Sequence, residues 1–346
     1  MRLVVNGKEQ HYDGEATVLA FLQSYRIEPN TVAVAVNGEI VPRERWAQTP
    51  LKEGDEVEVV HVVAGGSGPS LDPGLWPLGK PYRPEEDPLV IAGRTFTSRL
   101  ILGSSKYPSP EVMKAAWEAS GTQMVTVAIR YMNLEEGGGS GILSYIDRSR
   151  IHLLPNTAGA KTVQQAVRMA HLCREATGTN WIKLEVIGDD TYLWPDVAAT
   201  VEATKILVED GFVVLPYTSH DLVAALRLEE AGAATVMPLA SPIGSGQGFI
   251  DWVSIKRIID SVSVPVIVDA GIGTPSDAAI AMELGAAAVL TNTAVAKAKN
   301  PVLMAEAMKW AVLSGRMGYL AGRIPKRETA EPSSPPEGVI AARPSP

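Results

Sequence analysis

Cysteine is nearly absent from this sequence of 346 residues, in which Cys173 is the single example. One thiol excludes an internal disulfide and any metal cluster built on cysteines. Cys173 stands in the stretch "AVRMAHLCREA", whose apolar residues recur at helical spacing. This pattern favours a buried structural thiol over a reactive one.

Long apolar runs and a basic stripe are also missing, and no leader segment is expected. No apolar run approaches the roughly 18 residues that cross a bilayer, and the opening "MRLVVNGKEQ" lacks the apolar core of a signal peptide. We therefore expect a cytoplasmic protein with no membrane partner. The net charge is −8, and the basic residues do not gather into a stripe that could neutralise a phosphate backbone. Nucleic acid is not expected as a partner.

Residues 1–66 have the pattern of a small α+β unit. Two strand pairs, "RLVVNG" with "EQHYDG" and the two halves of "VAVAVNGEIV", flank a stretch with helical spacing, "TVLAFLQSY". A last alternating strand, "DEVEVVHVV", ends the unit. The diglycine Gly65-Gly66 follows shortly after this strand. By its pattern the unit is therefore complete at Gly66, although the chain continues to residue 346.

The composition changes abruptly after Gly66. Prolines stand at positions 69, 73, 77, 81, 84 and 88, with few aliphatic residues between them. Proline at this density holds a chain extended. The pattern predicts a linker over residues 67–88 that stays out of any core.

The next segment, residues 89–324, alternates short apolar runs with helical stretches such as 161–176, 220–231 and 275–284. Runs without polar alternation are typical of parallel strands buried on both faces. Eight such runs are present: "RLILGSS", "QMVTVAIR", "IHLLPNT", "WIKLEVI", "GFVVLPYT", "ATVMPLA", "VPVIVDAG" and "AAVLTNTA". They predict an α/β fold, a (β/α)8 TIM barrel with its active site at the C-terminal ends of the strands. An open doubly wound sheet is the alternative.

Two further segments of this region are less regular. The glycine-rich connection 131–149 is either a mobile flap or a plain surface insertion. Residues 325–346 are expected to form a C-terminal tail.

The strand "WIKLEVI" carries two charged residues. Side chains alternate along a strand, so Lys183 and Glu185 share the face opposite the aliphatic residues and are expected in the barrel mouth. Apolar surroundings would lower the pKa of this lysine, and a neutral amine is what imine formation with a ketone requires. A purely structural Lys183–Glu185 ion pair is the alternative.

Asp269 ends the apolar run "VPVIVDAGIG" and is expected at the same rim of the barrel. A second carboxylate near Lys183 would accept and donate the protons that imine chemistry moves. The alternative is that Asp269 only caps the helix that begins near Pro275.

Glycine-rich or polar turns follow three of the strands. Gly271-Ile272-Gly273 and Asn292-Thr293-Ala294 follow the seventh and eighth strands, where barrels often bind phosphate because glycine lets backbone N–H groups approach an anion. Gly244 and Gly246 in "SPIGSGQG" add to the same rim, or form a simple loop. We expect a phosphate site here.

These residues together resemble a known family. Residues 90 to about 339 resemble bacterial thiazole synthase, the ThiG family, which builds the thiazole phosphate of thiamin. The matching stretches are "RLILGSSKY", "TVAIRYMN", "LLPNTAGAKT", "TNWIKLEVIGD", "VLPYTSHD", "VMPLASPIGSG", "VDAGIGTPSDA" and "LTNTAVAKAKNP". Residues 1–66 are similar to the sulfur carrier of the same reaction, a ThiS-like β-grasp (ubiquitin-like) protein whose C-terminal diglycine is converted to a thiocarboxylate.

The resemblance implies a sulfur-transferring transferase in which Lys183 forms a Schiff base with 1-deoxy-D-xylulose 5-phosphate. Glu185 and Asp269 match the family's acid/base carboxylates. The positions that match the sugar-phosphate site are Gly244, Ala270, Gly271, Asn292 and Thr293. One departure is Ala160, which stands where many relatives carry a cysteine.

The resemblance also implies partners. Dehydroglycine, made by another enzyme, is the second substrate, and an adenylyltransferase activates the carrier at Gly65-Gly66. No metal or organic cofactor is implied, and a homo-oligomer is expected. Two other functions fit less well: a different Schiff-base barrel acting on a pentose phosphate, or a ubiquitin-like docking module on a barrel scaffold.

The diglycine poses a chemical problem, because the Gly66 carbonyl is bound in an amide to Ser67. Adenylation needs a free carboxylate. We therefore predict cleavage between Gly66 and Ser67; the alternative is that the first unit stays attached for docking while a separate carrier delivers sulfur.

Overall fold

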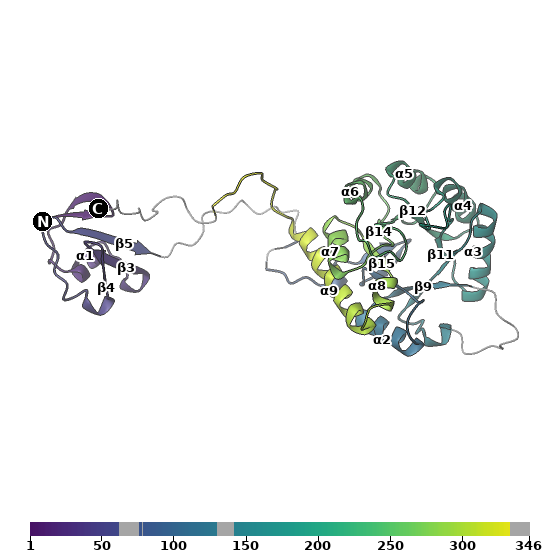
Figure 1. Ribbon diagram of the computed structural model, residues 1–346, viewed down its shortest axis with the longest axis horizontal. Coiled ribbons are helices and arrows are strands. Elements are labelled where there is room, and N and C mark those ends of the chain that lie inside the picture. The colour runs from purple at the N-terminus through teal and green to yellow at the C-terminus, as the bar shows by residue number, and fades with distance from the viewer. Residues whose placement is uncertain (62–75, 78, 130–141, 333–346) are drawn as a thin grey trace. The chain divides into compact units, whose positions relative to one another are not determined.

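The computed structural model describes residues 1–61, 76–77, 79–129 and 142–332 of the chain (Figure 1). The chain separates into two compact units. Several predicted features lie outside the described residues: the diglycine Gly65-Gly66, residues 67–75 and 78 of the predicted linker, residues 131–141 of the glycine-rich connection and residues 333–346 of the predicted tail.

The N-terminal unit is a mixed five-stranded sheet packed against one α-helix. Strand β5 lies at its centre, parallel to β1 on one side and antiparallel to β3 on the other. The hairpin turns Asn6-Gly7 and Asn37-Gly38 have φ values between 47° and 79°, as two-residue hairpin turns require. The elements are β1 (Arg2–Val5), β2 (Lys8–His11), α1 (Val18–Ser24), η1 (Pro29–Thr31), β3 (Val32–Val36), β4 (Glu39–Val41), η2 (Arg43–Arg45) and β5 (Glu56–His61). The predicted β-grasp order is confirmed.

The second unit is a parallel barrel that contains all eight predicted strands. Most of them are uninterrupted apolar runs, buried on both faces as in other parallel sheets. The strands are β8 (Leu100–Gly103), β9 (Met124–Ala128), β10 (His152–Asn156), β11 (Trp181–Leu184), β12 (Val213–Thr218), β13 (Met237–Pro238), β14 (Ile267–Val268) and β15 (Ala288–Thr291).

Helices surround the strands (Figure 1). They begin where short polar side chains cap the free N–H groups, as Thr162 does for α3 and Asp196 for α4. The helices are α2 (Pro110–Ser120), η4 (Ile142–Tyr145), α3 (Val163–Thr177), α4 (Val197–Glu209), α5 (Leu222–Glu230), α6 (Trp252–Ser261), α7 (Pro275–Glu283), α8 (Thr293–Ala296) and α9 (Pro301–Ala321). The described helices include none that is long and apolar enough to cross a membrane.

The ring of strands closes. From β8 to β13 each strand pairs with the next along the chain, β14 pairs with β15, and the last strand, β15, pairs with the first, β8. Parallel bridges Val236–Val266 and Leu239–Asp269 connect β13 to β14. The chain therefore forms the predicted (β/α)8 barrel, and the open doubly wound alternative is excluded.

A hairpin that the sequence analysis did not predict closes the N-terminal end of the barrel. Its strands are β6 (Leu89–Ile91) and β7 (Arg94–Phe96). Leu89, Ile91 and Phe96 pack against interior side chains that all eight strands contribute, among them Met124 and Trp181. The barrel interior at this end is a packed core.

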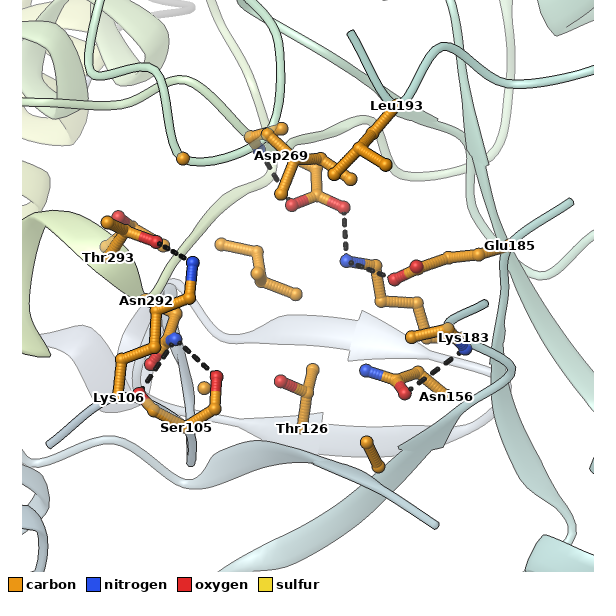
Figure 2. A pocket seen from close by; sticks show the side chains of 18 of the residues that line it. Ser105, Lys106, Thr126, Asn156, Lys183, Glu185, Leu193, Asp269, Asn292 and Thr293 are labelled. Carbon is orange, nitrogen blue, oxygen red and sulfur yellow. Dashed lines mark hydrogen bonds and ion pairs between the residues drawn. The ribbon is translucent and has the colours of Figure 1, made fainter. Parts of the chain in front are cut away.

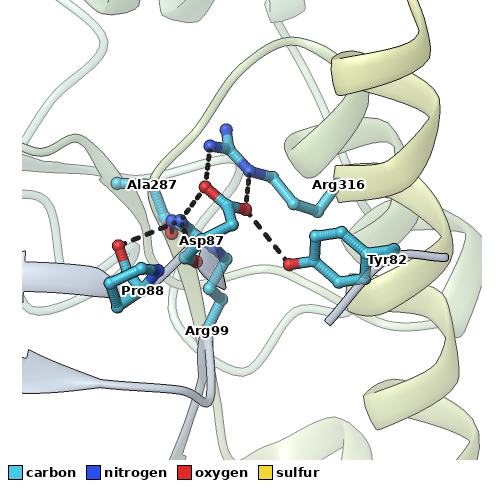
Figure 3. Close-up of polar contacts among 6 residues, drawn as sticks. All are labelled: Tyr82, Asp87, Pro88, Arg99, Ala287 and Arg316. Carbon is cyan, nitrogen blue, oxygen red and sulfur yellow. Dashed lines mark hydrogen bonds and ion pairs between the residues drawn. The ribbon is translucent and has the colours of Figure 1, made fainter. Parts of the chain in front are cut away.

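A buried ion cluster fastens the chain just before this hairpin (Figure 3). Asp87 follows the short 3-10 helix η3 (Pro84–Glu86). Its carboxylate accepts two hydrogen bonds of 2.7 Å from Arg316 on α9 and one of 3.1 Å from Arg99. The Tyr82 hydroxyl donates a further bond of 3.1 Å, and Arg99 also donates to the Ala287 carbonyl at 2.8 Å.

This cluster contradicts one part of the prediction for residues 67–88. The whole segment was expected to be a linker that stays out of any core, but its last residues pack against the barrel. Burial alone would raise the pKa of Asp87, but hydrogen bonds and charge from Arg316 and Arg99 outweigh it and lower the pKa below its ordinary value. The two guanidinium groups thus offset the cost of desolvating the carboxylate, and residues 82–88 belong to the barrel unit.

Cys173 lies on α3, where it packs against β11 and α4. Its side chain is 1% exposed, and burial raises the pKa of the thiol to about 12. The thiol therefore stays protonated at neutral pH, and the predicted buried position is confirmed.

Candidate active site

A cavity of about 450 Å³ opens at the C-terminal ends of the barrel strands. Residues that follow β8, β10, β11, β14 and β15 contribute to its wall. Its lining includes the catalytic candidates Lys183, Glu185 and Asp269, and five of the candidates for the phosphate site, which are Gly244, Ala270, Gly271, Asn292 and Thr293. Gly246, Gly273 and Ala294 of the same predicted turns are not part of this lining.

Strand β11 and the residue that follows it turn two charged side chains into this cavity, as the alternation predicted. Ile182, Leu184 and Val186 pack outward against α3 and α4. Lys183 and Glu185 face inward and are only 5% and 6% exposed (Figure 2).

The backbone of Glu185 is fixed by the residue that follows the neighbouring strand β10. The buried hydroxyl of Thr157 donates to the Glu185 carbonyl at 2.8 Å and accepts from its N–H at 2.8 Å. No role was predicted for Thr157 from the sequence, because its partner Glu185 is 28 residues away along the chain.

Asp269 completes a buried ion cluster with Lys183 and Glu185. The Lys183 ammonium lies 2.6 Å from Asp269 Oδ2 and 3.2 Å from Glu185 Oε1. Counted as one cation and two ionised carboxylates, the cluster has a net charge of −1. The structural alternative, an isolated Lys183–Glu185 pair, does not describe the site.

The protonation of Lys183 differs from the expectation. Burial does act to lower the pKa of Lys183, but charge and hydrogen bonding from Asp269 and Glu185 outweigh it and raise the pKa above its ordinary value. The predicted lowering was wrong because the strand alone did not show how close the second carboxylate lies. The lysine is an ammonium in this state, so it must lose a proton before it can attack a carbonyl carbon.

Asp269 is held by its own loop and caps no helix. Its Oδ1 accepts from the Ala270 N–H at 2.7 Å. Helix α7 is capped instead by Thr274 and Asp277, which form a capping box. The capping alternative for Asp269 is therefore excluded.

The chain after Asp269 takes an unusual path. Ala270 and Gly271 both have left-handed backbones, with φ of 59° and 72°. A side chain at Gly271 would lie 1.8 Å from the Ser241 hydroxyl, so only glycine fits. A left-handed alanine is uncommon, and such backbones cluster at functional sites.

The predicted phosphate-site residues come together on one side of the cavity. A Cβ built on Gly244 would lie 3.5 Å from the Thr293 hydroxyl, which places the turns after β13 and β15 side by side. The side chain of Asn292 is engaged elsewhere: its amide donates to the Ser105 carbonyl at 3.0 Å and the Ser105 hydroxyl at 2.9 Å (Figure 2).

Other residues of the cavity were not singled out from the sequence. Lys106 follows β8, Thr126 lies on β9, Asn156 ends β10 and Lys161 lies beyond it. Asp269 was predicted at the rim because it ends an apolar run. The same reasoning could have predicted Lys106 and Asn156, which also lie at or just beyond strand ends.

Tyr217 is a further neighbour, since its ring lies 5.7 Å from the Lys183 ammonium. Burial and the two carboxylates raise the pKa of Tyr217, so its hydroxyl stays protonated.

Comparisons with known proteins match the N-terminal unit and the barrel to two separate families. A family described as "Thiazole biosynthesis protein ThiG" matches residues 90–335, and the "ThiS family" matches residues 3–66.

Curated relatives of similar sequence carry the name thiazole synthase. One from Paramagnetospirillum magneticum is 45% identical over 340 residues, which cover 98% of this chain and 100% of the relative. One from Myxococcus xanthus is 56% identical over 256 residues, which cover 74% of this chain and 98% of the relative.

A solved structure is also similar. It is described as the crystal structure of the Amycolatopsis orientalis BexX/CysO complex. It matches with a TM-score of 0.63 and 35% identity, over 70% of this chain and 98% of that one.

Proposed function

The chain belongs to the thiazole synthase (ThiG) family and carries a ThiS-family domain at its N-terminus, and from this premise we propose how its residues perform the reaction. The chain is a thiazole synthase of thiamine biosynthesis. The two other functions considered from the sequence, a different pentose-phosphate barrel and a docking scaffold, are set aside on these matches. The observation that carries the mechanism is the buried ammonium of Lys183 between two carboxylates.

Lys183 is the proposed Schiff-base residue for 1-deoxy-D-xylulose 5-phosphate. Asp269, at 2.6 Å, accepts a proton from the ammonium when the ketone enters. The neutral amine then adds to the carbonyl carbon, whose oxygen takes up protons and leaves as water. A ketone and an ammonium become a protonated imine and water, so the cluster keeps its net charge of −1.

The two carboxylates have different proposed duties. Asp269 is the closer proton acceptor and returns its proton to the departing hydroxyl. Glu185, at 3.2 Å, stays beside the imine nitrogen and stabilises its positive charge. Its fixed backbone, bound twice by Thr157, supports this static role.

The turns that carry Gly244, Gly271 and Thr293 form the proposed phosphate subsite. Two of these residues are glycines with left-handed backbones, which let N–H groups approach an anion. Holding the phosphate there would leave the ketone end of the sugar toward Lys183 on the other side of the same cavity.

The ThiS-family domain identifies a sulfur carrier as the interacting partner. The remaining partners are proposed from the family: dehydroglycine, the enzyme that makes it, the carrier-activating adenylyltransferase and further copies of this chain. Sugar phosphates are cytoplasmic metabolites, so the cytoplasm is the proposed compartment.

Cleavage after Gly66 is the proposed origin of the active carrier. A carboxylate at Gly66 exists only when the bond to Ser67 is broken, and adenylation requires it. Intact-mass measurement on protein purified from its own host tests this step. We expect a carrier of 66 residues and a second chain of 346 − 66 = 280 residues; a single uncut mass together with full activity would contradict it.

Product analysis tests the whole function. Purified protein should form thiazole phosphate from 1-deoxy-D-xylulose 5-phosphate and dehydroglycine when a thiocarboxylated carrier is present. It should form none when the carrier ends in an ordinary carboxylate. Equal product in both reactions would remove the carrier from the proposal.

A further inference from the structure

A sugar phosphate brings about two negative charges to a cavity that already holds the net negative Lys183 cluster. The glycine turns and the Thr293 hydroxyl offer hydrogen bonds without positive charge. The described lysines that line the cavity are Lys106, Lys161 and Lys183. Lys183 is paired with two carboxylates and Lys161 with Asp190.

Lys106 is placed differently from the other two. Within the described ranges, its ammonium has no carboxylate within ion-pair distance, and its polar contact is the Thr293 hydroxyl at 3.5 Å. The same ammonium lies 3.6 Å from the position that a Cβ on Gly244 would occupy. Lys106 therefore reaches two of the three turns of the phosphate subsite, those of Gly244 and Thr293, from the loop after β8, the strand that pairs with β15 (Figure 2).

The backbone around Lys106 is strained and supported. Lys106 has φ of 69°, a left-handed conformation that non-glycine residues rarely adopt. In the barrel unit, the described non-glycine residues with positive φ are Ala92 in the hairpin turn, Lys106, Leu193 and Ala270. The last three line the cavity. Strain of this kind persists when surrounding contacts hold it in place.

Asn292 supplies those contacts. Its side-chain amide binds both the carbonyl and the hydroxyl of Ser105, the residue before Lys106. Asn292 can lie there because Gly103 has no side chain: a Cβ at that position would lie 2.6 Å from the Asn292 side chain. Asn292 thus acts on the loop after β8.

We propose that Lys106 is the charged ligand of the sugar phosphate, and that Asn292 is a positioning residue which holds Lys106 against Thr293 and Gly244. This inference rests on the proposed function and deepens it. It also changes the role expected for Asn292. The side chain of Asn292 supports the loop that carries Lys106, while the turn that contains Asn292 receives the phosphate.

The test compares two sugars in borohydride trapping. Lys106→Met should raise the concentration of 1-deoxy-D-xylulose 5-phosphate that gives half-maximal trapping by about 10- to 100-fold, the usual worth of a hydrogen bond to a charged group. Trapping of 1-deoxy-D-xylulose, which has no phosphate, should not change. Lys161→Met, a lysine of the same cavity that is already paired, is the matched control and should leave the preference for the phosphorylated sugar intact.

The outcomes separate the possible failures. An equal loss for both sugars, or no loss for either, would overturn the role of Lys106. If Lys106→Met traps both sugars normally but needs more dehydroglycine to form product, Lys106 binds the carboxylate of that substrate. This result would also overturn the proposed role of Lys106. If the wild-type protein traps neither sugar, the proposed function itself fails.

A double-mutant cycle tests the positioning role of Asn292. Asn292→Ala should weaken the binding of the phosphorylated sugar and leave the sugar without phosphate unaffected. Adding Asn292→Ala to Lys106→Met should cause little further loss, because both changes remove the same contact with the phosphate. Lys106→Arg should keep part of the affinity that Lys106→Met loses, provided that Asn292 is present. Additive losses would show that Asn292 acts independently of the lysine.

Discussion

Two buried ion clusters lie at opposite ends of the barrel, and their charges are inverted. At the C-terminal end one cation, Lys183, lies between two carboxylates. At the N-terminal end one carboxylate, Asp87, lies between two cations, Arg99 and Arg316. Both clusters are largely buried, so burial and charge alone do not mark a reactive site.

The difference lies in the cation and in the space beside it. An arginine stays charged in proteins, whereas a lysine can give up its proton and become a nucleophile. Asp87 receives several hydrogen bonds and its partner Arg99 borders a hollow of about 240 Å³, while Lys183 borders a larger cavity of about 450 Å³. The N-terminal cluster can hold the fold together, and the C-terminal cluster can also react.

Replacing Lys183 should produce the largest effect on activity. Lys183→Ala removes the nucleophile, and we expect turnover to fall on the order of 10⁴-fold or more. Lys183→Arg is the matched control, because it keeps a cation between the carboxylates but cannot form the imine. Steady-state turnover and thermal unfolding of both variants check this. Substantial activity in the arginine variant would reduce Lys183 to an electrostatic role.

Asp269→Asn should lower turnover by about 10²- to 10⁴-fold, the usual worth of a positioned acid/base group. Imine trapping should survive, because removing the Asp269 charge lets Lys183 lose its proton more easily even without that acceptor. The same change lowers the pKa of Lys183, so the pH at which trapping becomes fast should move down. A pH series of trapping rates measures this. Unchanged turnover would leave Asp269 without a catalytic part.

Asp87→Asn should affect stability and leave the chemistry at the other end of the barrel unchanged. The variant leaves Arg99 and Arg316 buried without a counter-charge, and we expect a loss of about 3–5 kcal/mol in the free energy of unfolding. Denaturant unfolding measures the loss, with turnover of the folded fraction as the control. Lost turnover in folded protein would show that the two ends are coupled.

The lowered pKa of Asp87 also predicts a pH dependence. The stability that this carboxylate contributes is present above its ordinary pKa of 3.8 and is lost as the pH falls through its lower folded value. Wild type and Asp87→Asn should therefore differ most at neutral pH and converge in strong acid. A constant difference down to the most acidic pH would contradict this assignment.

An exposed ion pair should have the smallest effect. Lys256 and Asp260 form an i,i+4 pair on the surface of α6. Lys256→Ala should change the unfolding free energy by about 0.5 kcal/mol or less. The same denaturant measurement gives the value, and a loss as large as that of Asp87→Asn would remove burial as the reason for the difference between the ion pairs.

Much of the barrel and part of the site followed from the sequence. Period-two alternation along one strand was enough to turn Lys183 and Glu185 inward, and strand ends identified Asp269. The pKa of Lys183 was mistaken because it depends on a carboxylate from a different strand. The role of Asn292 was likewise hidden, since its partner Ser105 lies far away in the sequence.

The N-terminal end of the barrel was harder to predict. Proline density indicated a linker, but that pattern reports backbone stiffness and carries no information on the two arginines that fix Asp87. One of them, Arg316, is contributed by the last helix, α9. The hairpin at residues 89–96 was missed for a similar reason, because its strands are three residues each.

Mass mapping of the trapped imine tests the central claim most directly. Wild-type protein treated with 1-deoxy-D-xylulose 5-phosphate and borohydride, then digested, should carry the reduced sugar adduct on the peptide that contains Lys183, and Lys183→Ala should carry none. An adduct on another lysine, or one that persists in Lys183→Ala, would contradict the account.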